Sequence, residues 1–416
     1  MNTSADPCFA PAVPLLGVEE AIERMLAQTG TVVRTRKAML ADAGGRILAE
    51  ALTAPLDVPG FDNSAMDGYA LNSADLATAR AGGLPVSQRI TAGMPGVPLI
   101  AGTCARIFTG APVPAGADTV VMQEVCREQD ARMVLDADAA VSAGANIRPR
   151  GNDIATGDTL LEPGCVLRAA HIGLVAAVGV DRLRIYRKLR VAVFSTGDEL
   201  VEPGHKLAPG RIYNSNRYLL HELLITQGCK VIDLGTVPDA PAATRTALTR
   251  AAARADLIIS SGGVSVGEED HVKAALQALG EMTLWRIRMK PGKPLAFGRV
   301  HKSAFIGLPG NPVSVFVTFL LFALPVIRRL QGRSDTVPVS YPVRADFSCR
   351  AKGRREYVRV QVRASAEGPV AQAYPRQGSD VLSSVAWADG LVEIAENATV
   401  QPGDSVRYLP FAQWQQ

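Results

Sequence analysis

Apolar residues recur along the chain with two different spacings, and the change of spacing divides it. From Leu16 to Gln28, Val18, Ile22 and Met25 lie on one face of an amphipathic helix, and Gly30 follows as a stop signal. From Val58 to about Arg150 the sequence consists of short segments with alternating apolar and polar residues, such as ARIFTG and DTVVMQEV, which are separated by Gly and Pro. This part predicts a small, mostly β domain.

Between Arg190 and Gln331 the pattern alternates between strands and helices. Apolar strands are predicted at VAVFS, KVIDLG, DLIIS, LWRIRM and AFIGL, and helices at 217–227, 242–255, 271–279 and 312–330. Near-continuous apolar strands that alternate with helices indicate a doubly wound, mostly parallel sheet covered on both faces.

The remaining segments complete an α/β multidomain organisation. Residues 151–188 combine turns, a helix near 169–178 and a basic strand at 182–189, which is typical of a connector that packs with the N-terminal helix. After Gln331 the sequence has the pattern of β-strands, without a convincing helix, and predicts a small β-barrel-like domain. The predicted domains are an elongated connector (14–57 with 148–188), a small β-rich domain (58–147), the α/β domain (189–332) and the C-terminal β domain (336–416).

Composition narrows the class of protein. The 416 residues are 47% hydrophobic and 20% charged, with a net charge of +4 and no Lys/Arg block, which favours a soluble globular protein and argues against nucleic acid as a partner. The six cysteines are far apart and the start lacks the features of a signal peptide, so we expect reduced thiols and a cytoplasmic location. The apolar run 313–327 is shorter than the ~20 residues that span a bilayer, so we expect a buried core helix.

Four loops of the α/β domain carry candidate chemistry. In SSGGVSVGEEDHV, Gly262 and Gly263 permit close backbone approach and Ser261 supplies a hydroxyl, so this loop suits an oxyanion. Its acids Glu268, Glu269 and Asp270 precede a helix, where plain capping explains them equally well.

The other three loops also present polar or charged residues next to predicted strands. STGDELVEPG holds Glu199, MKPGKP presents Lys290 and Lys293, and GLPGNPVS places Asn311 at a helix N-cap with Pro312 after it. Each of the three loops also has a purely structural interpretation. The first could be a capped turn and the second a solvent-exposed lysine turn, and the Pro and Gly residues of the third could simply end a strand and start a helix.

Together, these loops predict one site, because the carboxyl ends of parallel strands meet at one edge. Acids and lysines side by side favour a phosphorylated ligand with Mg²⁺ between carboxylate and phosphate. No GxGxxG, Walker or Gly-x-Ser-x-Gly motif is present, and the five histidines show no metal-ligand spacing.

Seven long motifs, spread over nearly the whole chain, resemble the MoeA family, which is related to the E domain of gephyrin. They are PGFDNSAMDGYA, RIFTGAPVP, RPRGNDI, VAVFSTGDEL, ISSGGVSVGEEDHV, MKPGKPLAFG and GLPGNPVS. The resemblance implies a molybdopterin molybdenumtransferase with a MoaB/Mog-like sheet domain. It further implies Mg²⁺-dependent insertion of molybdate into adenylylated molybdopterin with release of AMP, in a homodimer whose cleft is shared between subunits.

Site residues follow from the matching positions. The resemblance implies catalytic roles for Asp67, Thr109, Asp153, Glu199, Asp270 and Lys290, with Glu199 and Asp270 as metal ligands, and substrate binding by Asp239, Pro309, Pro312, Arg354 and Ser379. The loop chemistry adds Ser261, Gly262, Gly263, Lys293 and Asn311 as substrate-binding candidates. Asp67 and Asp153 are expected to come from the second subunit.

The chain departs from the family pattern at two positions. Arg286 stands where a lysine is expected, which keeps the charge but replaces a compact ammonium with a planar fork. Asn214 stands where an aspartate is common. Either change is expected to alter ligand affinity and not the reaction class, with Arg286 kept among the substrate-binding candidates.

Two other functions compete with this one. A molybdopterin adenylyltransferase uses a similar sheet domain for the preceding step, and a non-catalytic scaffold would bind the pterin or a partner, including other molybdenum cofactor biosynthesis proteins. The additional domains and FDNSAMDGYA favour metal insertion, and the lack of a long linker disfavours a scaffold.

Overall fold

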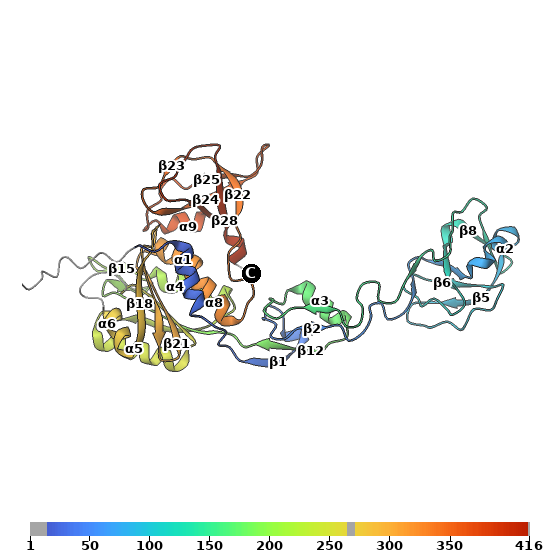
Figure 1. The fold of residues 1–416 in the computed structure, drawn as a ribbon, viewed down its shortest axis with the longest axis horizontal. Coiled ribbons are helices and arrows are strands. Elements are labelled where there is room, and N and C mark those ends of the chain that lie inside the picture. The colour runs from blue at the N-terminus through green and yellow to red at the C-terminus, as the bar shows by residue number, and fades with distance from the viewer. Residues whose placement is uncertain (1–14, 264–270, 415–416) are drawn as a thin grey trace, which may run out of the picture.

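The molecule is elongated, with two large units at one end and a small β domain at the other (Figure 1). The computed structural model describes residues 15–263 and 271–414. The sheet domain and the C-terminal domain lie against each other, and a thin neck made of two chain segments leads to the distal domain.

A six-stranded sheet forms the centre of the larger unit. Its first four strands in spatial order are parallel, and the fifth runs antiparallel to both of its neighbours, so five of the six strands share one direction, which confirms the predicted mostly parallel sheet. The antiparallel strand Pro294–Val300 was not predicted from the sequence. The spatial order is β16 (Lys230–Val237), β13 (Arg190–Thr196), β17 (Leu257–Ser261), β21 (Ser303–Leu308), β20 (Pro294–Val300) and β18 (Gly280–Arg286).

Helices cover both faces of this sheet, as predicted. Along β13, Val191 and Val193 face one hydrophobic core and Ala192 and Phe194 face another, because side chains alternate along a strand. The first core includes α4 (Ser215–Thr226), α7 (Pro312–Thr318) and α8 (Leu324–Gln331); the second includes α5 (Pro241–Arg254) and α6 (His271–Leu279).

The long apolar run is a buried core helix, as expected. Residues Pro312–Gln331 form the only helix in the described ranges that is long and apolar enough to cross a membrane, and 94% of its apolar window is buried. It is not regular, however: a π-helical segment, Phe319–Ala323, separates α7 from α8. Pro325 lacks a backbone N–H, so the missing hydrogen bond gives a physical reason for this local change of winding.

The N-terminal helix does not pack with the connector, which corrects that prediction. The buried residues Val18, Ala21 and Met25 of α1 (Val18–Ala27) belong to the core that includes α8. Their apolar face finds more buried surface there than the thin neck offers.

The neck and the distal domain are built from short strands. In the neck, β1 (Thr35–Met39) pairs antiparallel with β12 (Arg182–Tyr186), β2 (Leu52–Thr53) pairs with β11 (Thr159–Leu161), and α3 (Ala169–Ala177) packs beside them. The distal sheet has the order β7 (Thr119–Met122), β4 (Gly68–Leu71), β6 (Cys104–Ile107), β5 (Leu84–Ile90), β9 (Arg132–Leu135) and β8 (Cys126–Gln129), with α2 (Leu76–Ala81) against it and the pair β3 (Asn63–Ser64) and β10 (Ile147–Arg148) at its base.

Five strands close into a barrel in the C-terminal domain. They are, in order around the ring, β24 (Arg355–Arg363), β25 (Val370–Ala373), β22 (Tyr341–Ala345), β28 (Ser405–Pro410) and β26 (Gly390–Ile394). A further pair is β23 (Cys349–Arg350) with β27 (Thr399–Val400). The expectation of no helix here is wrong: α9 (Leu382–Trp387) forms, but its six residues are too few to show a helical period in the sequence.

Candidate functional site

The carboxyl ends of the four parallel strands meet at one edge of the sheet. Ser195 at the end of β13 is level with Ser261 of β17, and Ser261 is level with Leu308 of β21. The loops after these strands line two adjoining cavities of about 700 and about 530 Å³, which share Gly262, Gly263, Gly310, Asn311 and Asp380. The cavities therefore form one continuous pocket, called here the edge pocket.

Glycine is required where the loop after β17 enters this pocket. Gly262 has φ +84°, and a Cβ there would lie 2.7 Å from the carbonyl oxygen of Thr196. Gly263 has φ +65°, and its Cβ would lie 2.5 Å from Cγ2 of Val272. The loop thus brings backbone, not side chains, to the pocket wall.

Carboxylates line one half of the edge pocket. Glu199 and Asp239 both border the smaller cavity, and so does Ser261 at the end of β17, the strand next to β13 on the side away from β16. The backbone N–H of Asp239 donates to Oδ1 of Asp198 at 3.2 Å, which joins the loops after β13 and β16. In this loop the two-residue strands β14 (Leu200–Val201) and β15 (Ile212–Tyr213) pair in parallel.

Asn214 is a buried structural residue at the wall of this acidic half. Its Nδ2 donates to Oγ1 of Thr236 at 2.9 Å, and its Oδ1 accepts from the N–H of Arg217 at 3.2 Å, which caps α4. An amide can donate and accept at once, whereas an ionised aspartate could only accept. The departure from the family pattern therefore suits the local hydrogen bonds.

Lysines line the other half. Lys290 and Lys293 border the larger cavity together with Pro309 and Arg354. Lys290 lies in β19 (Met289–Lys290), which pairs with β24 of the barrel, and its Nζ donates to both carboxylate oxygens of Glu356 at 3.2 and 3.3 Å. The barrel thus holds the lysine loop in place.

The N-terminus of α7 is met by a loop of the barrel. Asn311 is the N-cap residue and Pro312 follows it, as the sequence indicates, but the amide of Asn311 does not cap the helix. Its Nδ2 donates to Oγ of Ser379 at 2.9 Å, and the carbonyl of Ser379 accepts from the N–H of Val313 at 3.1 Å. Ser379 therefore takes one of the free backbone donors of the helix.

Two predicted residues are not placed at the pocket. Arg286 lies at the end of β18, level with Pro294, and does not line either cavity. Asp270 lies outside the described residues, so its position as a metal ligand stays a prediction.

Three predicted residues lie in or next to the distal domain, away from the edge pocket of the same chain. Asp67 accepts at Oδ1 from the N–H and the hydroxyl of Thr109, both at 2.7 Å, and these hydrogen bonds lower the pKa of Asp67 below its ordinary value. Asp153 lies at the junction of neck and distal domain, where its N–H donates to the carbonyl of Val58. The distal domain is well separated from the edge pocket within one chain (Figure 1).

The sequence interpretation missed several pocket residues. Gln377, Gly378 and Asp380 come from the barrel loop, and Tyr213 and Asn216 come from the segment before and at the start of α4. Asn216 donates from Nδ2 to the carbonyl of Gly310 at 2.6 Å. The run RQGSD does carry a signal, since Gly, Ser and Asp together are typical of a binding turn.

The arrangement suits a ligand with several negative oxygens. Lysines and backbone N–H groups can hold oxyanions on one side, while carboxylates on the other can share a cation with them. Within the part of the chain that the structure describes, no three His, Cys, Asp or Glu side chains cluster closely enough to hold a metal ion without further ligands.

Comparisons with known proteins assign the family. Models of the MoeA N-terminal region (domains I and II), a probable molybdopterin binding domain and the MoeA C-terminal region (domain IV) match residues 16–179, 192–329 and 343–411. A molybdopterin molybdenumtransferase of Haemophilus influenzae is 38% identical over 95% of this chain and 99% of its own length. One from Nostoc sp. is 41% identical over 76% of this chain and 74% of its own length.

Solved structures agree with these sequence matches. A molybdopterin biosynthesis MoeA protein from Pyrococcus horikoshii superposes with a TM-score of 0.80 at 30% identity and covers 96% of this chain and 99% of that chain. A second structure from the same organism gives a TM-score of 0.82 at 27% identity, over 95% and 100%. The chain therefore belongs to the MoeA family of molybdenum cofactor biosynthesis enzymes.

Proposed function

We propose that the protein inserts molybdate into adenylylated molybdopterin and releases AMP, which makes it a molybdopterin molybdenumtransferase. The observation that carries this proposal is the edge pocket, where acids and lysines from separate loops line one continuous space. An adenylylated pterin has phosphate oxygens that need cations or N–H donors, and molybdate is itself an oxyanion. Lys290, Lys293 and Arg354 supply positive charge for these groups.

The residues of the pocket fit Mg²⁺. This ion is usually held by one or two carboxylates together with substrate phosphates and water. Glu199 and Asp239 offer carboxylates beside a space large enough for a nucleotide, and Asp270 is the further proposed ligand. When bound, the ion would neutralise phosphate charge that the carboxylates alone would repel.

We further propose a homodimer with a shared cleft. Asp67 and Thr109 form an exposed, hydrogen-bonded pair, yet they lie in the domain farthest from the edge pocket of the same chain (Figure 1). A second copy in a two-fold arrangement would bring its own Asp67, Thr109 and Asp153 to this pocket. Molybdate and adenylylated molybdopterin are the proposed substrates, and other cofactor biosynthesis proteins the proposed suppliers and acceptors.

We also propose a cytoplasmic location without membrane or nucleic-acid binding. The five described cysteines are free thiols, which suits a reducing compartment.

A direct assay tests the reaction. Purified protein with adenylylated molybdopterin and Mg²⁺ is expected to release AMP only when molybdate is added. Consumption of ATP to make the adenylylated form would instead support the adenylyltransferase. Pterin binding without any turnover, under the same conditions, would support the scaffold.

A further inference from the structure

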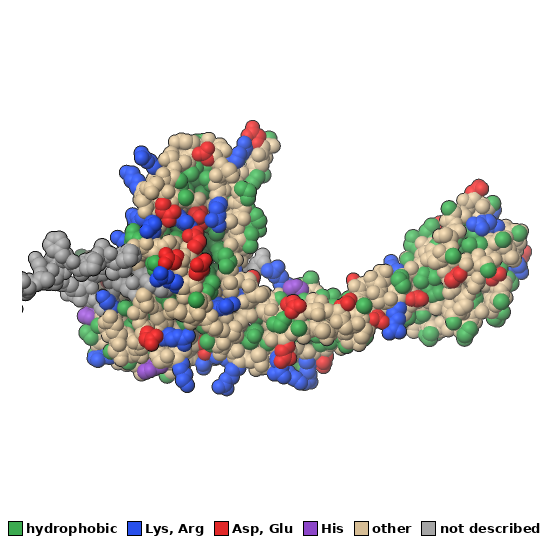
Figure 2. Space-filling model, viewed as in Figure 1, with side chains coloured by type: hydrophobic (Ala, Val, Ile, Leu, Met, Phe, Trp, Pro, Cys, Tyr) green, Lys and Arg blue, Asp and Glu red, His purple; other side chains and the backbone are tan. Residues whose placement is uncertain are grey.

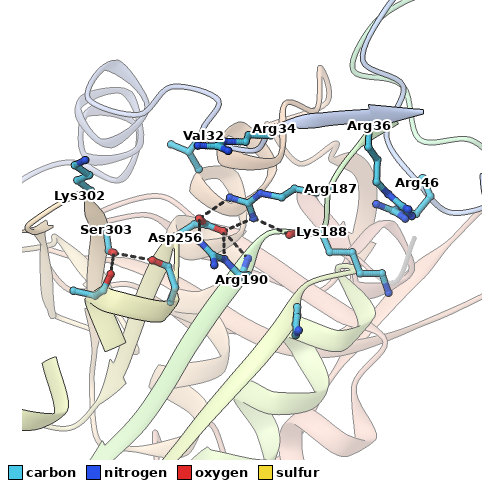
Figure 3. A pocket seen from close by; sticks show the side chains of 13 residues that line it. Val32, Arg34, Arg36, Arg46, Arg187, Lys188, Arg190, Asp256, Lys302 and Ser303 are labelled. Atoms are coloured by element: carbon cyan, nitrogen blue, oxygen red, sulfur yellow. Dashed lines mark hydrogen bonds and ion pairs between the residues drawn. The ribbon is translucent and has the colours of Figure 1, made fainter. Parts of the chain in front are cut away.

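A second large cavity lies at the opposite end of the parallel strands from the edge pocket. It measures about 1260 Å³ and is bordered by the residues before and within β1, by the turn between β12 and β13, and by the starts of β16 and β21 (Figure 3). We call it the basic groove. Lys and Arg side chains project from the lower edge of the molecule under the sheet domain and the neck (Figure 2).

The charge of the basic groove is strongly one-sided. Eight Lys and Arg side chains line it against a single carboxylate, that of Asp256. The seven excess positive charges exceed the +4 of the entire chain, so this charge is concentrated locally. Such a concentration creates a strong attractive field for anions.

The single carboxylate of the groove is already paired with two of the arginines. Asp256 accepts from Arg187 at 2.7 and 2.8 Å and from the side chain of Arg190 at 3.1 Å, as well as from the N–H of Arg190 at 2.9 Å (Figure 3). It therefore fixes two of the cations and leaves the others without a counter-charge.

The remaining six cations form no ion pair with any residue in ranges 15–263 and 271–414. Two of them, Arg36 and Arg46, lie side by side (Figure 3). Burial lowers the pKa of Arg46, and repulsion from Arg36 lowers it further. The other four are Arg34, Lys188, Lys230 and Lys302. Holding like charges together costs free energy that a bound anion would recover.

The lining argues against a nucleotide as the natural occupant. Its apolar members are Val32, Ala252 and Ala255, and no aromatic side chain borders the groove. A nucleobase or single-stranded nucleic acid would lack the stacking partner that such sites use. The space also exceeds the roughly 300–1,000 Å³ of typical small-molecule pockets.

The spacing of the cations matches an extended chain. Arg34 and Arg36 are two residues apart on a paired stretch, since the carbonyl of Arg34 accepts from Arg187 and Arg36 is level with Ile185. Side chains two apart along a strand repeat about every 7 Å on one face. Carboxylates at alternate positions of an extended peptide have the same repeat.

We propose that the basic groove binds an extended acidic segment of a partner protein. The segment docks away from the edge pocket, so a bound partner leaves that pocket open. The inference does not rest on the proposed reaction, because it concerns a different surface and its test measures binding alone.

The test measures binding of a fluorescently labelled peptide of five Glu-Ser repeats to the full-length protein by anisotropy at low and moderate salt. Binding is expected to weaken steeply with salt, and the Gln-Ser analogue is expected not to bind. Replacing Arg34→Glu together with Arg36→Glu is expected to weaken binding at least about tenfold, since both charges are reversed. The control Lys352→Glu with Arg363→Glu makes the same charge change on the exposed barrel surface.

Each outcome decides the proposal. Loss of binding in the groove variant with retention in the control supports it, provided both variants unfold at the wild-type temperature. Equal binding by both variants, or equal loss in both, overturns it. Tighter, groove-dependent binding of inorganic triphosphate or of a single-stranded DNA oligonucleotide than of the peptide also overturns it, in favour of a small polyanion or a nucleic acid.

Discussion

Lys290 is held by a side chain from another domain. Glu356 is mostly buried in the barrel, and its carboxylate accepts from Nζ of Lys290, whose own side chain is half exposed at the pocket. A lysine on a long flexible stem gains a preferred position from such a contact. Glu356 is thus a positioning residue, not a catalytic one.

Replacing Glu356→Gln is therefore expected to lower kcat for AMP release about tenfold, the effect of losing roughly 1.4 kcal/mol of positioning in the transition state. Steady-state kinetics with molybdate in excess measure it. Glu367→Gln serves as the matched control, because Glu367 pairs with Arg344 on the exposed barrel surface. Equal rates for the two variants would show that Glu356 does not position Lys290.

Gly262 gives a second prediction at the residue scale. Gly262→Ala is expected to lower the free energy of unfolding by about 1–3 kcal/mol, because the new Cβ meets the backbone carbonyl of Thr196 at a positive φ. Gly310→Ala adds the same methyl group to the same pocket, where nothing lies within 4 Å. Urea unfolding compares the two variants, and similar stabilities would contradict the account of this loop.

At the scale of elements, Asp256 fastens the neck to the sheet domain. It precedes β17, and its partners Arg187 and Arg190 stand at the turn from β12 into β13. Burial alone would raise the pKa of Asp256, but the hydrogen bonds from Arg187 and Arg190 and the charge of Arg187 outweigh it and lower the pKa to about 2.

The sign of the resulting pH dependence follows from this lowered pKa. The stabilisation is complete above the ordinary value near 3.8 and is lost as the pH falls towards 2. The stability difference between wild type and Asp256→Asn is expected to shrink by about 2 kcal/mol between pH 5 and pH 2. Urea unfolding at several pH values measures this difference, and a constant gap would refute the assignment.

The sequence predicted those elements that show a clear pattern within their own residues. LIISS and VAVFS are continuous apolar strands, and the loops after them contain the glycines and acids of the edge pocket. It also predicted a small β-barrel-like C-terminal domain, which the closed barrel confirms. It did not predict contacts between distant segments. The pairing of β19 with β24, the packing of α1 against the core that includes α8, and the cations gathered around Asp256 each depend on residues far apart in the chain, which no local period reveals.

At the scale of the whole molecule, the neck separates the edge pocket from the distal domain that carries Asp67 and Thr109 (Figure 1). The central claim is that the working site combines the edge pocket of one subunit with these residues of another. Neither part is then sufficient by itself, and the elongated shape becomes a functional requirement.

Subunit mixing tests this claim most directly. Asp67→Asn and Glu199→Gln are each expected to abolish molybdate-dependent AMP release as homodimers. After the two variants are unfolded, mixed in equal amounts and refolded together, half of the dimers contain both, and each of these has one intact site if sites are shared. The account predicts recovery of about a quarter of the wild-type activity, as expected for a two-fold dimer, whereas no recovery, with mixed dimers shown to be present, would contradict it.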